Sequence, residues 1–312
     1  MTSLLISLRV VTPIFLFILL GMLVRRLGWV CEATLKQMDG IGFRVLLSTQ
    51  LFYSVYRADR DLTQYGKPLI FSLAVTAVIF LASFFIFTQL EKEPRRRGPM
   101  IQCMIRYNFA IFGMAVVTAL FGAEKTGLIA VLAAVIIPVT STIAAILFEV
   151  YRGGKISPAK LLLNILKNPF LIGAALGMVF LLSGLRLPQV LESVVSDISG
   201  MATPYCLIVL GGSIHLSRIG DYGRSLKITV IGKSLLVPLL FIPLAVVLGF
   251  RGETLAALAV MLACPTAVSG FTLANQCGAD GELAGQLVVI TTLLSIVTMF
   301  LTLWILAAKA FI

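Results

Sequence analysis

Long apolar stretches separated by short polar or charged segments run along the whole 312-residue chain. A helix needs about 20 apolar residues to cross a bilayer, and each stretch is close to that length. Strands of a membrane barrel would alternate apolar and polar residues, and these stretches do not alternate. The pattern therefore predicts an all-α integral membrane protein with ten membrane-spanning helices, at residues 5–24, 37–56, 68–89, 99–121, 126–150, 169–186, 192–214, 226–249, 253–276 and 282–308.

The composition agrees with a bilayer as the environment. Hydrophobic residues make up 59% of the chain, charged residues make up 12%, and the mean hydropathy is +1.03. A soluble domain has about 25% charged residues. The net charge of +11 could favour nucleic acid, but Lys and Arg lie in short clusters between the apolar stretches. In that position they orient helices and contact anionic lipid, so we expect a lipid bilayer and no nucleic acid as partner.

An internal repeat appears when the second half of the chain is laid on the first with a constant offset of 156 residues. The matched positions include Pro13 with Pro169, Gly21 with Gly177, Gly28 with Gly184, and the GAE at 122–124 with the GAD at 278–280. The pattern predicts one membrane-embedded unit of two five-helix repeats, residues 1–156 and 157–312. Because five is odd, the second repeat enters the membrane from the opposite side, which gives inverted topology.

The positive charges predict how the chain is oriented. Fourteen Lys and Arg residues lie on the side of the connections after spans one, three, five and seven, against eight on the other side. The side richer in Lys and Arg faces the cytoplasm, so both termini are expected outside it, in the inner (plasma) membrane. The first stretch ends at Arg25 and Arg26 without a small-residue cleavage site, so we expect it to be a retained span.

Polar residues interrupt the ninth apolar stretch, in the segment LACPTAVSGFTLANQ at 262–276. Pro265 has no N–H and its ring clashes with the preceding turn, so the helix is expected to open there. Thr266, Ser269 and Asn275 add polar groups at the opening, where such groups are costly in lipid. In inverted repeats, interrupted helices meet at the substrate site, so these four residues are candidate binding residues.

The offset of 156 places a matching break in the fourth stretch, IRYNFAIFGMAVV. Asn108 and Gly113 lie there without a proline, and both join the candidate binding set. A glycine beside a polar amide weakens a helix less than a proline does. Close helix packing is the competing explanation for Gly113 and Ser269, since small residues also serve that role in membranes.

Two cationic residues inside spans indicate the sign of the ligand. Arg106 lies in the fourth stretch, and Lys233 lies in the eighth with apolar residues on both sides. A cation in that environment must pair, reach the interface or face a cavity. Lys233 could bind an anion or take part in charge coupling, or it could pair structurally with a carboxylate such as Asp39 or Asp197. Half-helix N-termini also favour anions, so we expect a carboxylate substrate.

Several classes of function lack their motifs. No GxxxxGK[ST] motif is present, so the chain has no evident ATPase, and the single histidine belongs to no hydrolytic motif. The five cysteines form no CxxC pair, so no metal site and no cofactor are expected. The remaining prediction is a secondary transporter of a small organic anion, with Na⁺ or H⁺ as candidate coupling ions. An anion channel or a membrane sensor of an organic acid is the alternative.

Five segments, taken together, resemble the auxin efflux carrier family, and most closely its bacterial malate and malonate permease branch. They are PIFLFILLGMLVRRLG, KNPFLIGAALGMVF, ATPYCLIVLGGSI, GKSLLVPLL and ACPTAVSGFTLANQCGADGELAG, in this order along nearly the whole chain. The resemblance implies ten spans in two inverted repeats, with broken helices four and nine crossing. It also implies that an organic anion such as malate, malonate or an auxin-like acid binds beside the crossing, and a homodimer is a candidate assembly.

The resemblance also assigns residues. Asn108 and Gly113 match the family's fourth-span motif, Pro265, Ser269 and Asn275 lie in the ninth-span motif, and Lys233 matches the usual lysine of the eighth span. Three positions depart from the pattern: Ala115 and Ser48 stand where the family has prolines, and Ser269 stands where an asparagine is common. These departures bear on the substrate more than on the fold.

Overall fold

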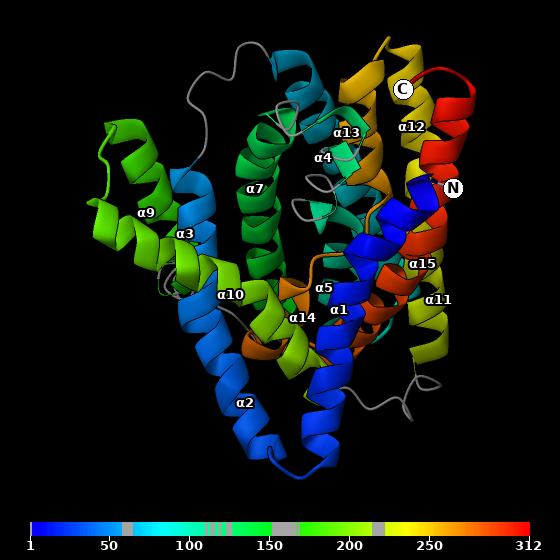
Figure 1. Cartoon of the computed structure of the whole chain (residues 1–312). Helices are drawn as coiled ribbons and strands as arrows, with labels where there is room; N and C mark the ends of the chain where they lie inside the picture. The colour runs from blue at the N-terminus through cyan, green and yellow to red at the C-terminus, as the bar shows by residue number, and fades with distance from the viewer. Residues whose placement is uncertain are drawn as a thin grey trace.

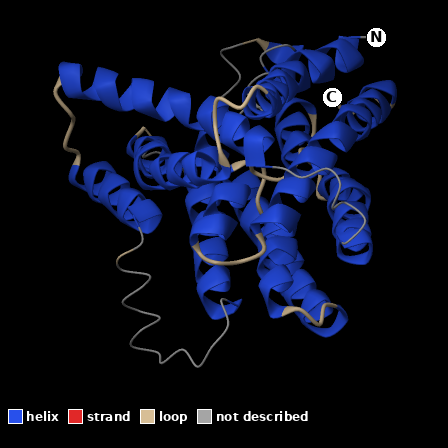
Figure 2. Ribbon diagram, turned by 90° about the horizontal axis from the view of Figure 1, so that it is seen from below, coloured by secondary structure: helices blue, strands red, loops and turns tan. Residues whose placement is uncertain are grey.

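The computed structural model describes residues 2–57, 65–109, 112, 116–117, 120–122, 127–151, 167, 169–213 and 222–312. Within these residues the chain forms helices, turns and short breaks, with no strand (Figure 2). Five of the described helical segments are long and apolar enough to cross a membrane: Gly66–Leu90, Val131–Tyr151, Gln189–Ser213, Gly223–Val247 and Gly281–Ala308. The chain is therefore an all-helical membrane protein, as its apolar stretches predict.

Figure 1 labels the helices in chain order. The elements of the first half are α1 (Thr2–Arg26), α2 (Glu32–Ile41), the π-helical turn η1 (Gly42–Leu47), α3 (Ser48–Tyr56), α4 (Gly66–Leu90), α5 (Pro94–Ile105) and α7 (Gly127–Tyr151). Those of the second half are α9 (Pro169–Ser183), α10 (Gln189–Ser213), α11 (Gly223–Ile231), the π-helical turn η5 (Gly232–Leu236), α12 (Val237–Val247), α13 (Gly252–Ala263), α14 (Ser269–Gln276) and α15 (Gly281–Ala308).

Two of the predicted spans are helices with a wide turn in the middle. The stretch predicted at 37–56 is the continuous helix α2–η1–α3, and the stretch predicted at 226–249 is the continuous helix α11–η5–α12. In Figure 1 the two chain ends lie at the same, upper right, part of the molecule. The connection between α1 and α2 lies at the opposite, lower end.

Glycines bring the two halves of the chain into close contact. Helix α1 packs against α10, and α3 packs against α9. A Cβ atom on Gly21 would collide with the carbonyl of Ile208 on α10, and a Cβ on Gly177 would lie 2.7 Å from the carbonyl of Phe52 on α3. Lipid tails are as apolar as the helices, so close van der Waals packing at small residues is what holds such helices together.

Two pairs of glycines related by the offset of 156 share an unusual backbone conformation. Gly28 and Gly184 have φ angles of 74° and 80°, and Gly122 and Gly278 have φ angles of 97° and 74°. Residues with a side chain rarely adopt positive φ, whereas glycine does so without steric cost. Each pair therefore ends a helix with the same kind of turn, so the sequence offset has a counterpart in the backbone.

The interrupted helices occupy the interior. Every residue of 255–263 in α13 is buried, as is every residue of 98–105 in α5. Helix α5 contacts α7 and α15, and α13 contacts the same two helices. The outer helices instead expose large apolar side chains such as Leu182, Leu239 and Val247, which suits a surface that faces lipid.

Candidate functional site

Two helices, α13 and α5, end inside the molecule at short non-helical segments. Helix α13 ends at Ala263, Cys264–Val268 is not helical, and α14 begins at Ser269. Helix α5 ends at Ile105, and Arg106–Asn108 is not helical. The first break contains Pro265, as the sequence predicts. The second lies at the N-terminal end of the region where a matching break is expected, and it forms without a proline.

The two breaks contact each other through their backbones. The N–H of Asn108 donates to the carbonyl of Pro265 at 2.9 Å. The N–H of Thr266 donates to the hydroxyl of Thr291 on α15 at 3.3 Å. Backbone groups released from a helix in a membrane must find partners within the protein, and these bonds supply them. The breaks therefore stabilise each other, in keeping with a role as one site.

Lys233 explains how α5 ends without a proline. Its side chain extends from η5, is 1% exposed, and donates to the carbonyls of Met104 at 3.2 Å and Arg106 at 3.3 Å. Its Nζ also lies 3.8 Å from the centre of the Tyr107 ring. A cation suits the negative end of a helix and a ring face. Among the described residues its hydrogen-bond partners are main-chain carbonyls rather than a carboxylate.

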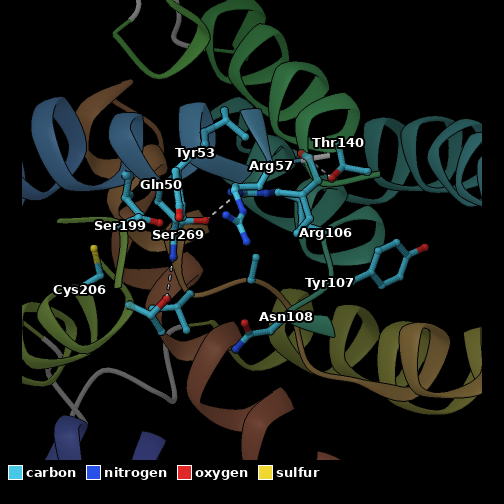
Figure 3. A pocket seen from close by; sticks show the side chains of 16 residues that line it. Gln50, Tyr53, Arg57, Arg106, Tyr107, Asn108, Thr140, Ser199, Cys206 and Ser269 are labelled. Atoms are coloured by element: carbon cyan, nitrogen blue, oxygen red, sulfur yellow. Dashed lines mark hydrogen bonds between the residues drawn. The ribbon is translucent and has the colours of Figure 1, made fainter. Parts of the chain in front are cut away.

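A cavity of about 520 Å³ lies against both breaks, and we call it the central cavity (Figure 3). Arg106–Asn108 of one break and Ala267–Ser269 at the other form part of its wall, and η1, α3, α7 and α10 form the rest. Its lining residues are Leu47, Gln50, Leu51, Tyr53, Arg57, Arg106, Tyr107, Asn108, Ile137, Thr140, Ser199, Thr203, Cys206, Ala267, Val268 and Ser269.

Two guanidinium groups line the central cavity in different environments. Arg106 is 2% exposed, and its Nη2 donates to the hydroxyl of Ser269 at 2.6 Å (Figure 3). It also donates to the hydroxyl of Ser141 at 3.3 Å. The side chain of Arg57 is 59% exposed and forms an ion pair with Glu192 at 3.0 Å. The cavity therefore has one cationic group deep in the protein and another at its exposed end.

The structure brings together only part of the residue set predicted from the sequence. Arg106, Asn108 and Ser269 line the central cavity. Pro265 and Thr266 form the break beside it, and Thr266 is fully buried. Lys233 lies behind the break and outside the cavity lining, and Asn275 lines a different cavity. Gly113 lies outside the described residues.

Sequence reasoning missed several polar residues of the cavity wall. Gln50, Tyr53 and Arg57 lie three and four residues apart on α3 and its C-terminal end, and Ser199, Thr203 and Cys206 have a similar spacing on α10. Residues at that spacing share one face of a helix. The walls also bond to each other, because Gln50 Nε2 donates to Thr203 Oγ1 at 3.2 Å. Helical periodicity of polar residues within apolar spans is the signal that could have found them.

A second cavity, of about 500 Å³, lies near the connection between α1 and α2, and we call it the lower cavity. Its lining residues are Arg25, Glu32, Leu35, Lys36, Asp39, Ser213, Phe271, Asn275, Gln276 and Glu282. The continuous helix α2–η1–α3 borders both cavities, with residues 32–39 at the lower one and residues 47–57 at the central one. The two cavities thus lie towards opposite ends of one helix.

A multi-pass helical membrane protein with interrupted helices beside a polar cavity has the architecture of a membrane transporter. The family described as membrane transport protein matches residues 6–305, and the chain belongs to this family, the auxin efflux carrier family that its motifs indicate. It is therefore a membrane transporter.

Two relatives match over almost their full lengths. A protein of Methanothermobacter thermautotrophicus named "Uncharacterized transporter" is 25% identical over 96% of this chain and 97% of its own length. A protein of Rhizobium meliloti named "Putative malonate transporter" is 26% identical over 92% of both chains. Both names agree with the class of protein that the fold and the cavities define.

Proposed function

We propose that this transporter moves a small organic anion, a mono- or dicarboxylate, by secondary active transport with alternating access. The observation that carries the proposal is the position of Arg106, a buried guanidinium at the contact of two helix breaks that also lines a cavity. A guanidinium offers paired N–H donors that match a carboxylate. The bond from Arg106 to Ser269 ties this cation to the second break, so an anion on Arg106 would be sensed by both broken helices.

The second guanidinium favours a substrate with two carboxylates, such as malonate or malate. Arg57 lines the same cavity, and its partner Glu192, which is 27% exposed and also accepts from Tyr56, is a carboxylate that an incoming anion could replace. A volume of about 520 Å³ lies in the range of small-molecule sites. The name of the Rhizobium relative points to the same substrate class.

Alternating access would come from two inverted repeats, residues 1–156 and 157–312, arranged as ten spans with broken helices four and nine crossing. The paired glycine turns and the reciprocal contacts of α1 with α10 and of α3 with α9 support this arrangement. The central and lower cavities would then be the two entrances, each open in one state of the cycle. Lys and Arg counts favour an orientation with both termini outside the cytoplasm, in the plasma membrane.

The test is transport by the isolated chain in proteoliposomes, with labelled malonate, malate and indole-3-acetate under separately imposed Na⁺ and proton gradients. We expect saturable malonate uptake against its own gradient, with unlabelled dicarboxylates competing better than monocarboxylates. Uptake that never saturates would identify a channel instead. Binding without uptake would identify a sensor, and either result would refute the proposal.

A further inference from the structure

Asp39 is a buried carboxylate with an incomplete set of partners. It lies on α2, is 4% exposed, and lines the lower cavity. Its Oδ2 accepts a hydrogen bond from Gln276 Nε2 at 3.0 Å, whereas its Oδ1 has no partner among the described residues. Burying a charged oxygen without a partner is costly, so such an atom calls for an explanation.

Three polar groups around Asp39 come from one helix, α14, while Tyr205 and Cys206 on α10 also lie near it. Thr272 and Asn275 face the Asp39 carboxylate without completing a bond to Oδ1, and Gln276 bonds to Oδ2. These three residues lie three and four positions apart on α14, so they share one face of that helix. Thr272 is fully buried, and its hydroxyl also has no partner among the described residues. The Asp39 carboxylate and the neighbouring Thr272 hydroxyl therefore each have an oxygen without a hydrogen-bond partner among the described residues.

The electrostatics around these two oxygens favour a cation. Asn275 and Gln276 are the last two residues of α14, and the C-terminal end of a helix carries partial negative charge. In transporters with interrupted helices, half-helix C-terminal ends are characteristic positions for coupling cations. Of the charged residues in the same cavity, Glu32 is paired with Lys36 at 3.4 Å, and Arg25 donates to the carbonyl of Gly212 at 2.6 Å.

We infer that Asp39 and Thr272 form a binding site for one Na⁺ ion, with Gln276 holding the Asp39 carboxylate in place. Carboxylate and hydroxyl oxygens are ligands that hard cations prefer, and Asp39 Oδ1 and Thr272 Oγ1 are such oxygens without a partner among the described residues. Asp39 supplies the one negative charge of this pair of residues, which one Na⁺ ion would balance. The site joins α2 to α14, and α14 begins at Ser269, which lines the central cavity.

The position of the site gives it a role in coupling, and this part rests on the proposed transport function. A Na⁺ ion between α2 and α14 would hold the lower end of the bundle closed and fix the second break. That break carries the Ser269 hydroxyl bonded to Arg106. Na⁺ and the anion would therefore favour the same conformation, which is the condition for positive coupling between two sites.

The experiment measures Na⁺ binding without any organic anion. The purified full chain is unfolded thermally in rising NaCl, with choline chloride keeping ionic strength constant and KCl as the size control. We expect a saturable rise in the unfolding temperature with Na⁺ and a much smaller one with K⁺, since a ligand of the native state stabilises it. Asp39→Asn should abolish the response, and Thr272→Val should weaken the apparent Na⁺ affinity by about tenfold or more.

Glu32→Gln is the matched control, because Glu32 is an exposed acidic residue on the same helix and in the same cavity. It should keep the full response to Na⁺. If Asp39→Asn does not fold, Thr272→Val carries the test, since it removes one hydroxyl at nearly constant shape. The site would be overturned if the unchanged chain showed no response to Na⁺. It would also be overturned if Asp39→Asn and Thr272→Val both responded as strongly as the unchanged chain, or if acid stabilised the protein in place of Na⁺. This experiment measures no uptake, so its outcomes do not bear on the transport proposal. A chain that binds Na⁺ but takes up no anion would refute the transport proposal and leave the Na⁺ site standing.

Discussion

The two guanidinium groups of the central cavity provide a matched pair of substitutions, Arg106→Gln and Arg57→Gln. Arg106 is buried and positioned by Ser269, whereas Arg57 is exposed and already paired with Glu192. A hydrogen bond to a charged group contributes about 1.5 to 3 kcal/mol when it is shielded from water. Loss of the Arg106 contact should therefore weaken malonate binding by about 10- to 150-fold. An exposed ion pair contributes about 1 kcal/mol or less, so Arg57→Gln should cost about fivefold at most.

The assay is the concentration dependence of labelled malonate uptake into proteoliposomes, with the amount of folded transporter measured by size-exclusion chromatography and thermal unfolding. Arg106→Lys is a third variant that keeps the charge and loses the planar pair of donors, so it should lie between Arg106→Gln and the unchanged protein. Equal losses for Arg57→Gln and Arg106→Gln would refute the reasoning. Unchanged affinity in Arg106→Gln with normal folding would do so as well.

Three further substitutions test the breaks and the helix packing. Lys233→Gln leaves one neutral amide for two carbonyls, so it should slow uptake while folded protein stays in the membrane; unchanged uptake would contradict its role at the break. Pro265→Ala restores a backbone N–H that can continue α13, so uptake per folded molecule should fall more than the yield of folded protein; equal falls would make the break purely structural. Gly211→Ala places a Cβ against the carbonyl of Ile18 and should cost about 1 to 3 kcal/mol of stability. Gly200→Ala on the same helix is the control, because its Cβ would meet open space. Equal unfolding temperatures for the two variants would contradict the packing explanation.

The two breaks differ in how far the sequence could predict them. The break at Pro265 follows from local chemistry, because a proline cannot continue the hydrogen-bond pattern of its helix. The break after Ile105 depends on Lys233, which lies far along the chain and binds the carbonyls that the helix releases. Such a contact exists only in the folded protein, so pattern reasoning could indicate the region from the repeat but could not give its cause.

The candidate site shows the same limit within a single helix. Ser269 and Asn275 are six residues apart, which turns a helix by about 600° and advances it by about 9 Å. The two side chains therefore point to different faces, and the structure places them in different cavities. The six-residue spacing could therefore have indicated, from the sequence, that Ser269 and Asn275 line different cavities. The contribution of Arg57 required knowing that the end of α3 borders the cavity formed by helices from elsewhere in the chain.

The glycine contacts between α1 and α10 and between α3 and α9 have a consequence for how the protein is made. Each contact joins a helix from the beginning of the chain to one synthesised much later. Helices α1 and α3 must therefore remain in the bilayer with these contact surfaces covered only by lipid until α9 and α10 have been inserted. Neither half of the chain contains both sides of these two contacts, so two halves expressed as separate chains should accumulate only when both are present in the same cell.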